Sequence, residues 1–309
     1  METVNVKYPS SLIEAIETFS DPRICLDVVA GAKWGSVGPI CPACTSQRLS
    51  FLQTRLMWKC LDYKKQFTVK VGTIFEDSPI PLKKWLCAMW LLANCKNGVS
   101  SYEIARDLKV TQTTAWFMLQ RLRYTMHTGS INKMTGEVEA DETHIGGKAR
   151  FMHKDKRDKM RGRSNFGKAI VLGLLERETG QVRTAVVPDR SKEVLQGAIR
   201  RNVRKRAHLM TDEHLAYDGL GSDYTHKVIN HAESYVEGNV HTNRMENFWS
   251  LLKRTIKGTY VSVEPFHLFR YLDEQSFRYN ERKLTDAERF AKVLGAISGK
   301  RLTYARVKG

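Results

Sequence analysis

The chain has 309 residues, 42% of them hydrophobic, and its 50 Lys and Arg against 33 Asp and Glu give a formal charge of +17 at pH 7. This length and composition exclude a disordered chain and predict two or three domains, at least one with a substantial core. The longest clean apolar run, WLCAMWLLA at 85–93, is too short to span a bilayer, so we expect a cytoplasmic protein without a membrane partner.

The positive charge is concentrated in blocks, and it predicts a polyanionic partner such as nucleic acid. A generally basic protein without such a partner is the plain alternative.

Residues 1–78 predict a small, turn-rich module with short strands around RLSFLQTRLMWKC and QFTVKVGTIF. Cys41 and Cys44 form a C-x-x-C pair, and Cys60 follows, as in a zinc ribbon whose two knuckles supply thiolates to one tetrahedral ion. The second knuckle is incomplete, because Tyr63 stands where its last cysteine belongs. Three thiolates that bind zinc and three buried cysteines without a ligand are both consistent with this pattern.

Residues 79–130 predict an all-helical region. Ser100 or Ser101 caps one helix, and a short turn at KVTQ leads to a second helix, an arrangement similar to a helix-turn-helix. Four residues of this pair are expected to face outward and to contact DNA: Thr111, Gln112, Thr113 and Arg121. An ordinary amphipathic helix pair is the structural alternative.

Residues 131–285 predict a mixed α/β domain, because strands at EVEADETHI, AIVLGLLERE and QVRTAVVPD precede a helix at SKEVLQGAIRRNV and a strand at AHLMTD. A basic insertion at 148–168 predicts a loop, and residues 286–309 predict a basic C-terminal tail. The insertion and the RRNVRKR run at 200–206 are expected to neutralise DNA phosphates, with a solvated surface as the alternative.

The acidic residues of the first strand alternate between its faces. Glu139 and Asp141 share one face with Thr143, whereas Glu142 lies on the other face with Val138 and Ala140. Asp141 is therefore the candidate ligand, with Glu139 as a neighbour that tunes it.

Two further carboxylates complete the candidate site. Asp212 ends an apolar strand, and Glu246 lies in the first turn of a helix that begins near Thr242 or Asn243. Lys253, seven residues after Glu246, projects from nearly the same face of that helix. Each acid alone has a structural explanation, as a solvated strand residue, a loop initiator or a capping residue. Together, Asp141, Asp212 and Glu246 suit a two-metal site for phosphoryl transfer.

The order of these motifs resembles the DDE transposases of bacterial insertion sequences, in the zinc-ribbon group with an ISXO-type catalytic domain. The resemblance rests on CPAC with WKC, QFTVKVGTIFEDSPIPLKKW, VEADETHIGGK, LMTDEHLAYDGLG, HTNRMENFWSLLKRTIKGTY and HLFRYLDEQSFRYNER. Tyr63 departs from the family's zinc ribbon and leaves the catalytic motifs unaffected.

The resemblance implies an RNase H-like catalytic domain behind a zinc-ribbon module and a helix-turn-helix. It implies that Asp141, Asp212 and Glu246 hold two Mg²⁺ or Mn²⁺ ions, and that Lys253 and Arg254 contact transposon-end DNA. The expected activity is cleavage and strand transfer on double-stranded DNA, in a homodimer or larger complex. Two rivals remain: a non-catalytic DNA-binding regulator, and an RNase H-like nuclease without strand transfer.

Overall fold

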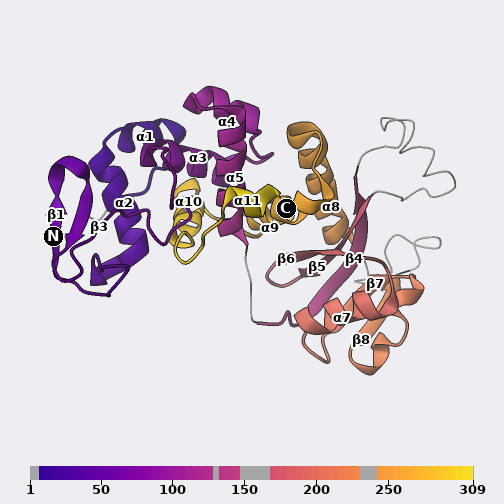
Figure 1. Ribbon diagram of the computed structural model, residues 1–309. Coiled ribbons are helices and arrows are strands. Elements are labelled where there is room, and N and C mark those ends of the chain that lie inside the picture. The colour runs from indigo at the N-terminus through magenta and orange to yellow at the C-terminus, as the bar shows by residue number, and fades with distance from the viewer. Residues whose placement is uncertain (1–6, 128–131, 147–167, 230–241, 309) are drawn as a thin grey trace. The chain divides into compact units, whose positions relative to one another are not determined.

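The computed structural model describes residues 7–127, 132–146, 168–229 and 242–308. The chain forms two compact units, Met1–His127 with Lys283–Gly309 and Thr128–Arg282 (Figure 1). We call them the N-terminal unit and the sheet unit, and each is described by itself. None of the described helices is long and apolar enough to cross a membrane.

The sheet unit is built on five strands in the order β6-β5-β4-β7-β8. They are β4 (Glu137–Ile145), β5 (Ala169–Glu176), β6 (Gln181–Val187), β7 (His208–Asp212) and β8 (Thr225–Ile229). β4, β5 and β6 pair antiparallel, whereas β4 pairs parallel with β7, and β7 pairs parallel with β8. The predicted mixed α/β domain is confirmed, and the arrangement is compatible with an RNase H-like fold.

Helices cover both faces of this sheet (Figure 1). On one face, α7 (Lys192–Asn202) packs Leu195 and Ile199 into a core with Val138 and Ala140 of β4. On the other face lie α8 (Asn243–Thr255) and α9 (Leu268–Asn280). Their apolar side chains form a second core with β4, β5 and β6: Ile145, Val171, Leu175, Val182, Met245, Phe248, Trp249, Leu252, Leu268, Tyr271 and Leu272.

The parallel pairing of β4 with β7 is short, and this positions the candidate site. The ladder runs from Glu137–His208 to Glu139–Met210, whereas β4 continues along β5 to Ile145. The ends of β4 and β7 are therefore not held together by backbone hydrogen bonds beyond Glu139.

The N-terminal unit combines a three-stranded antiparallel sheet with helices. Its strands are β1 (Leu49–Leu52), β2 (Met57–Cys60) and β3 (Gln66–Phe67). Its helices are α1 (Leu12–Thr18), α2 (Pro22–Trp34), α3 (Leu82–Asn94), α4 (Ser101–Leu108), α5 (Gln112–Met126), α10 (Asp286–Gly295) and α11 (Tyr304–Lys308). Helices α1 and α2 are absent from the sequence prediction for residues 1–78.

The C-terminal segment differs from the predicted tail. Thr285 and Glu288 form a reciprocal capping box that starts α10. Phe290 on this helix is fully buried, and its ring lies 5.6 Å from that of Phe19. Residues 286–309 are therefore part of the N-terminal unit.

Candidate acidic site on β4 and at the end of β7

Asp141 is held by both of its carboxylate oxygens. Oδ1 accepts a hydrogen bond from the Glu142 backbone N–H at 2.8 Å, and Oδ2 accepts one from the Trp249 indole Nε1–H on α8 at 2.9 Å. Burial raises the pKa of Asp141 to about 6, the charges of Glu142 and Asp212 add to this, and the two hydrogen bonds oppose it. The carboxylate thus has a fixed orientation and an environment in which a cation would stabilise its charge.

Asp212 is the last residue of β7, and its Oδ1 accepts a hydrogen bond from the His214 backbone N–H at 3.2 Å. One oxygen from each of Asp141, Glu142 and Asp212 lies within 4.8 Å of the others. We call these three residues the acidic cluster. The structure therefore brings together Asp141 and Asp212, as the sequence predicts, and adds Glu142.

Glu142 was missed as a member of this cluster. The alternation of β4 correctly places it on the opposite face from Asp141, on the side of Arg190, whose Nε lies 3.6 Å from its Oε1. It still reaches Asp212 because the β4–β7 ladder stops at Glu139. The available signal was the adjacency of two acids within β4, which the face argument alone discards.

Glu246 lies on α8 and is exposed, with its Oε1 3.4 Å from the Thr242 hydroxyl that donates to it. Among the described residues it does not join the acidic cluster. Its neighbours on the helix are nevertheless bonded to β4: the Met245 N–H donates to Glu139 Oε2, and Trp249 donates to Asp141. Glu246 is thus carried on a helical turn anchored to the strand that bears Asp141.

The anchor at Glu139 is a buried ion pair. The Glu139 side chain is fully buried and accepts from Arg177 Nε at 2.7 Å and from the Met245 N–H at 2.9 Å. A carboxylate at the first turn of a helix also interacts favourably with the helix dipole. Glu139 therefore fixes the beginning of α8 on β4.

A glycine gives α8 the space to approach the sheet. Gly173 on β5 pairs with Asp141 on β4. A Cβ atom at Gly173 would lie 2.5 Å from the Trp249 ring and would also overlap the Met245 side chain. The hydrogen bond between Trp249 and Asp141 thus depends on a residue without a side chain at position 173, namely Gly173.

Cations surround this end of β4. The pKa of His144 is lowered first by burial and then by the positive charges of Arg190, Lys168 and Lys253. Lys253 is half-buried and Arg254 is exposed in the last turn of α8. The basic insertion predicted at 148–168 lies outside the described residues except for Lys168, and the basic run at 200–206 begins in the last turn of α7.

In the N-terminal unit, α4 and α5 form where the sequence places them. The Thr111 hydroxyl caps α5 by accepting from the Thr114 N–H, and Gln112 donates to the Ser101 hydroxyl on α4, whereas Thr113 is exposed. The side chains of Thr111 and Gln112 therefore also serve the structure of the helix pair.

The expected outward position of Arg121 is wrong. Its side chain is 5% exposed, and its guanidinium donates to the backbone carbonyls of Ile74, Glu76 and Leu302. The guanidinium also lies 4.6 Å from the centre of the Phe117 ring. Segments distant in sequence cover this face of α5, so Arg121 binds the fold together and is not available to DNA.

The three cysteines converge as the ribbon pattern requires. The Sγ atoms of Cys41, Cys44 and Cys60 all lie within 4.8 Å of one another, and those of Cys44 and Cys60 are 3.6 Å apart. The Tyr63 N–H donates to Cys60 Sγ, and the Tyr63 side chain is exposed. The cluster offers three thiolates, and zinc binding by it stays a prediction.

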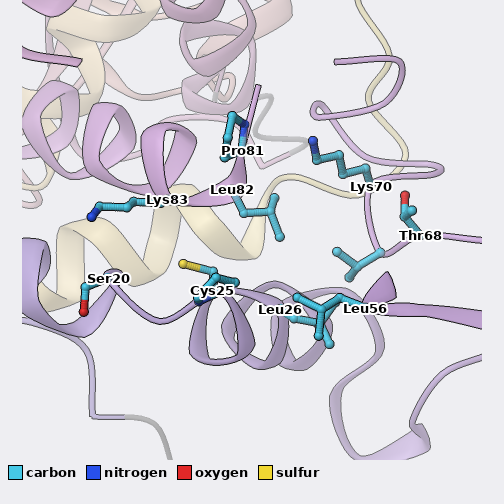
Figure 2. Close-up of a pocket in the computed structure, with 11 residues that line it drawn as sticks. Ser20, Cys25, Leu26, Leu56, Thr68, Lys70, Pro81, Leu82 and Lys83 are labelled. Atoms are coloured by element: carbon cyan, nitrogen blue, oxygen red, sulfur yellow. The ribbon is translucent and has the colours of Figure 1, made fainter. Parts of the chain in front are cut away.

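A separate cavity of about 330 Å³ lies in the N-terminal unit between α2, the start of α3 and the segment around Thr68 (Figure 2). Leu26, Leu56 and Leu82 are among its lining residues, and no carboxylate lines it. Burial raises the pKa of Cys25 in its wall to about 12, which keeps this thiol neutral and unreactive at neutral pH. The cavity is not part of the acidic site.

Residues 133–280 match the ISXO2-like transposase domain family, and this range includes the acidic cluster and all of α8. The chain is 26% identical to an uncharacterized protein in the transposable element ISH50 of Halobacterium salinarum, over 77% of this chain and 84% of that protein. It is 30% identical to an uncharacterized transposase-like protein of Haemophilus influenzae, over 34% of this chain and 85% of that protein.

Among solved structures, the simian T-cell lymphotropic virus intasome in complex with the PP2A regulatory subunit B56 gamma matches at 14% identity. The match covers 56% of this chain and 63% of that chain with a TM-score of 0.29, which is too low to support a structural argument. The family match and the two relatives all name transposases or transposable elements, and the matched range contains the acidic cluster. The chain belongs to the ISXO2-like transposases, which are DDE transposases of insertion sequences.

Proposed function

We propose that this protein binds the ends of its insertion sequence and catalyses metal-dependent DNA cleavage and strand transfer. The observation that carries the proposal is the convergence of Asp141 and Asp212 with a third carboxylate in a chain of this family. The net charge of +17 supports double-stranded DNA as the partner, both as transposon end and as target.

The residues present fit divalent cations. Carboxylate oxygens are the ligands that Mg²⁺ and Mn²⁺ prefer, and the acidic cluster supplies them from three side chains. Both oxygens of Glu142 are buried without a hydrogen-bond partner in the described part of the chain, which is costly unless a cation is near. Two divalent ions bound here would stabilise negative charge on the attacking and leaving oxygens of phosphodiester exchange.

We assign the residues the following roles. Asp141 and Asp212 hold the cations, with Asp141 oriented by the Trp249 indole. Glu246 is the third ligand of the expected triad. The helical turn that carries it is fixed to β4 through Met245 and Trp249, so Glu246 is held on the same side of β4 as Asp141.

Lys253 and Arg254 bind phosphates of the transposon end. In strand transfer, the 3′-oxygen of that end forms a bond to a target phosphorus while the bond from this phosphorus to the target's own 3′-oxygen breaks. One phosphodiester replaces another, so the reaction needs no covalent intermediate with the protein.

The N-terminal unit is proposed to recognise DNA. The exposed Thr113 on α5 is the best-placed member of the predicted contact set, and the cluster of Cys41, Cys44 and Cys60 would hold a structural zinc ion. Because transposition joins both ends of one element to a target, we propose at least a dimer in the working complex.

The test is a joining assay on the DNA that flanks the coding region. Labelled duplexes carrying these flanks are incubated with the full chain, target plasmid and Mg²⁺ or Mn²⁺, and products are separated by size. We expect end-specific joined products that disappear in Asp141→Asn and Asp212→Asn and persist in Asp218→Asn, an exposed acid of the same unit outside the acidic cluster. Cleavage without joining would favour a nuclease, and binding without cleavage would favour a regulator.

A further inference from the structure

Glu142 is an acid whose side chain is buried beside two other acids. Its side chain is 1% exposed. Neither of its carboxylate oxygens has a hydrogen-bond partner in the part of the chain that the structure describes. A carboxylate in this state is unfavourable unless an opposite charge compensates for its lost hydration.

The protein itself compensates only in part. Arg190 Nε lies 3.6 Å from Glu142 Oε1, beyond the usual range of a charge-assisted hydrogen bond. Both Arg190 Nε and the Tyr217 hydroxyl are themselves buried and lack a hydrogen-bond partner among the described residues. Arg190 and the Tyr217 hydroxyl thus lie close enough to Glu142 to favour its charged form, but without a hydrogen bond of ordinary geometry to it.

Glu142 also lies close to the other two acids of the cluster. Its carboxylate lies within 4.8 Å of those of Asp141 and Asp212, although Asp141 projects from the opposite face of β4. Three carboxylates this close repel one another strongly unless a cation lies among them.

We propose that Glu142 is a further carboxylate of the metal centre, giving an oxygen to a divalent cation bound with Asp141 and Asp212, while Arg190 and Tyr217 position it. This inference rests on the proposed function, because it uses the same centre. It adds a ligand from the α7 face of the sheet, whereas Glu246 approaches from the α8 face. The cation would then lie between ligands from both faces of β4.

The test measures Mn²⁺ binding to the full chain by isothermal titration calorimetry, without DNA and without turnover. We expect Glu142→Gln to weaken Mn²⁺ binding at least tenfold, because removal of groups that bind or orient a cation has this effect. Glu142→Asp, which keeps the charge and withdraws it by one methylene, is expected to weaken binding less. Asp218→Asn is the matched control and should bind as the unaltered chain does.

Thermal unfolding of the same proteins separates a ligand from a structural ion pair. If Glu142 is a ligand, the metal-free Glu142→Gln protein unfolds at the same or a higher temperature, because a repelled buried charge is removed. Its stabilisation by Mn²⁺ is then reduced. A lower metal-free unfolding temperature with undiminished stabilisation by Mn²⁺ would overturn the inference.

Asp212→Asn distinguishes the inference from the function on which it rests. Weakened Mn²⁺ binding in Asp212→Asn with unchanged binding in Glu142→Gln and Glu142→Asp would overturn the role of Glu142 and leave the metal-dependent function standing. Unchanged binding in both Asp212→Asn and Glu142→Gln would overturn the metal centre itself, and the role of Glu142 with it.

Discussion

The substitution Glu139→Gln tests how the candidate site is assembled. Glu139 is fully buried, and it is bonded both to Arg177 and to the Met245 N–H at the start of α8. Glutamine retains an oxygen that accepts from Met245 but loses the charge that compensates the 8% exposed Arg177 side chain. Breaking a buried ion pair on one side costs about 3–5 kcal/mol.

The structure places the expected loss at the lower end of that range. Arg177 keeps a second carboxylate, Glu137 Oε2, at 3.2 Å, although this partner is 41% exposed and worth only about 0–1 kcal/mol. We therefore expect Glu139→Gln to lower the free energy of opening of the β4–α8 region by about 3 kcal/mol. Glu139→Ala also leaves the Met245 N–H without its acceptor, which adds about 1–3 kcal/mol.

Hydrogen exchange read by mass spectrometry is the suitable assay, because the chain has two units and a single unfolding transition is not assured. Peptides from β4 and α8 should exchange faster in Glu139→Gln, while peptides from α4 and α5 remain unchanged. Glu137→Gln is the matched control, with an expected effect below about 1 kcal/mol. Equal effects of the two variants, or a change under about 0.5 kcal/mol in Glu139→Gln, would refute the conclusion that the Glu139 ion pair holds α8 on β4.

Four other changes have defined outcomes. Gly173→Ala should destabilise the sheet unit by about 1–3 kcal/mol, because its Cβ overlaps the Trp249 ring, as measured by urea denaturation. Burial raises the pKa of Asp141 in the folded protein to about 6, so protonated Asp141 favours the folded state of the metal-free protein at low pH. This contribution to the free energy of unfolding is lost as pH rises through 6. Mn²⁺ competes with that proton, so its affinity should fall up to about tenfold per pH unit below 6, as measured by titration. Tyr63→Cys completes a four-thiolate site and should retain zinc against a chelator that strips the unaltered chain, as measured by metal analysis. Arg121→Lys should lower stability by about 2 kcal/mol or more through weakened bonds to buried carbonyls, with unchanged DNA affinity of the folded protein.

Each of these has a contrary result. A Gly173→Ala protein as stable as the unaltered chain would contradict the close approach of α8. A Mn²⁺ affinity that stays constant from about one pH unit below the pKa of Asp141 to about one unit above it would contradict burial as the dominant influence on this pKa. Zinc lost equally from both proteins would contradict the geometry of the cysteine cluster. Loss of DNA affinity without loss of stability in Arg121→Lys would indicate that Arg121 contacts DNA after all.

Strand alternation predicted the acidic face of β4 well because the period of a strand is strict. Glu139 lies with Asp141 on the side of α8, and Val138 and Ala140 face α7, as expected. Alternation says nothing about where two strands separate. The approach of Glu142 to Asp212 depends on the end of the β4–β7 ladder, which is set by tertiary structure.

The misplacement of Arg121 has a different physical origin. A helical wheel separates apolar from polar positions, and an arginine is ordinarily assigned to solvent. It cannot indicate that the carbonyls of Ile74, Glu76 and Leu302 surround the guanidinium. By contrast, α2 had a readable signal, because Asp21 caps it and Pro22 occupies its first turn.

In the proposed function, the acidic cluster and the basic charge of the chain would act on the same DNA partner. Carboxylates on β4 and at the end of β7 would repel a DNA phosphate, and over distances of about 10 Å this repulsion is only partly screened. Arg190, Lys168 and Lys253 are close enough to lower the pKa of His144 on the same strand, so a phosphate approaching this end of β4 meets cations as well. Arg190 lies at ion-pair distance from the cluster, 3.6 Å from Glu142 Oε1, and the proposed divalent ions would bind the carboxylate charge that this one pair leaves uncompensated. In the proposed function, the basic residues around the site would therefore attract DNA without replacing the divalent cations that its carboxylates would bind.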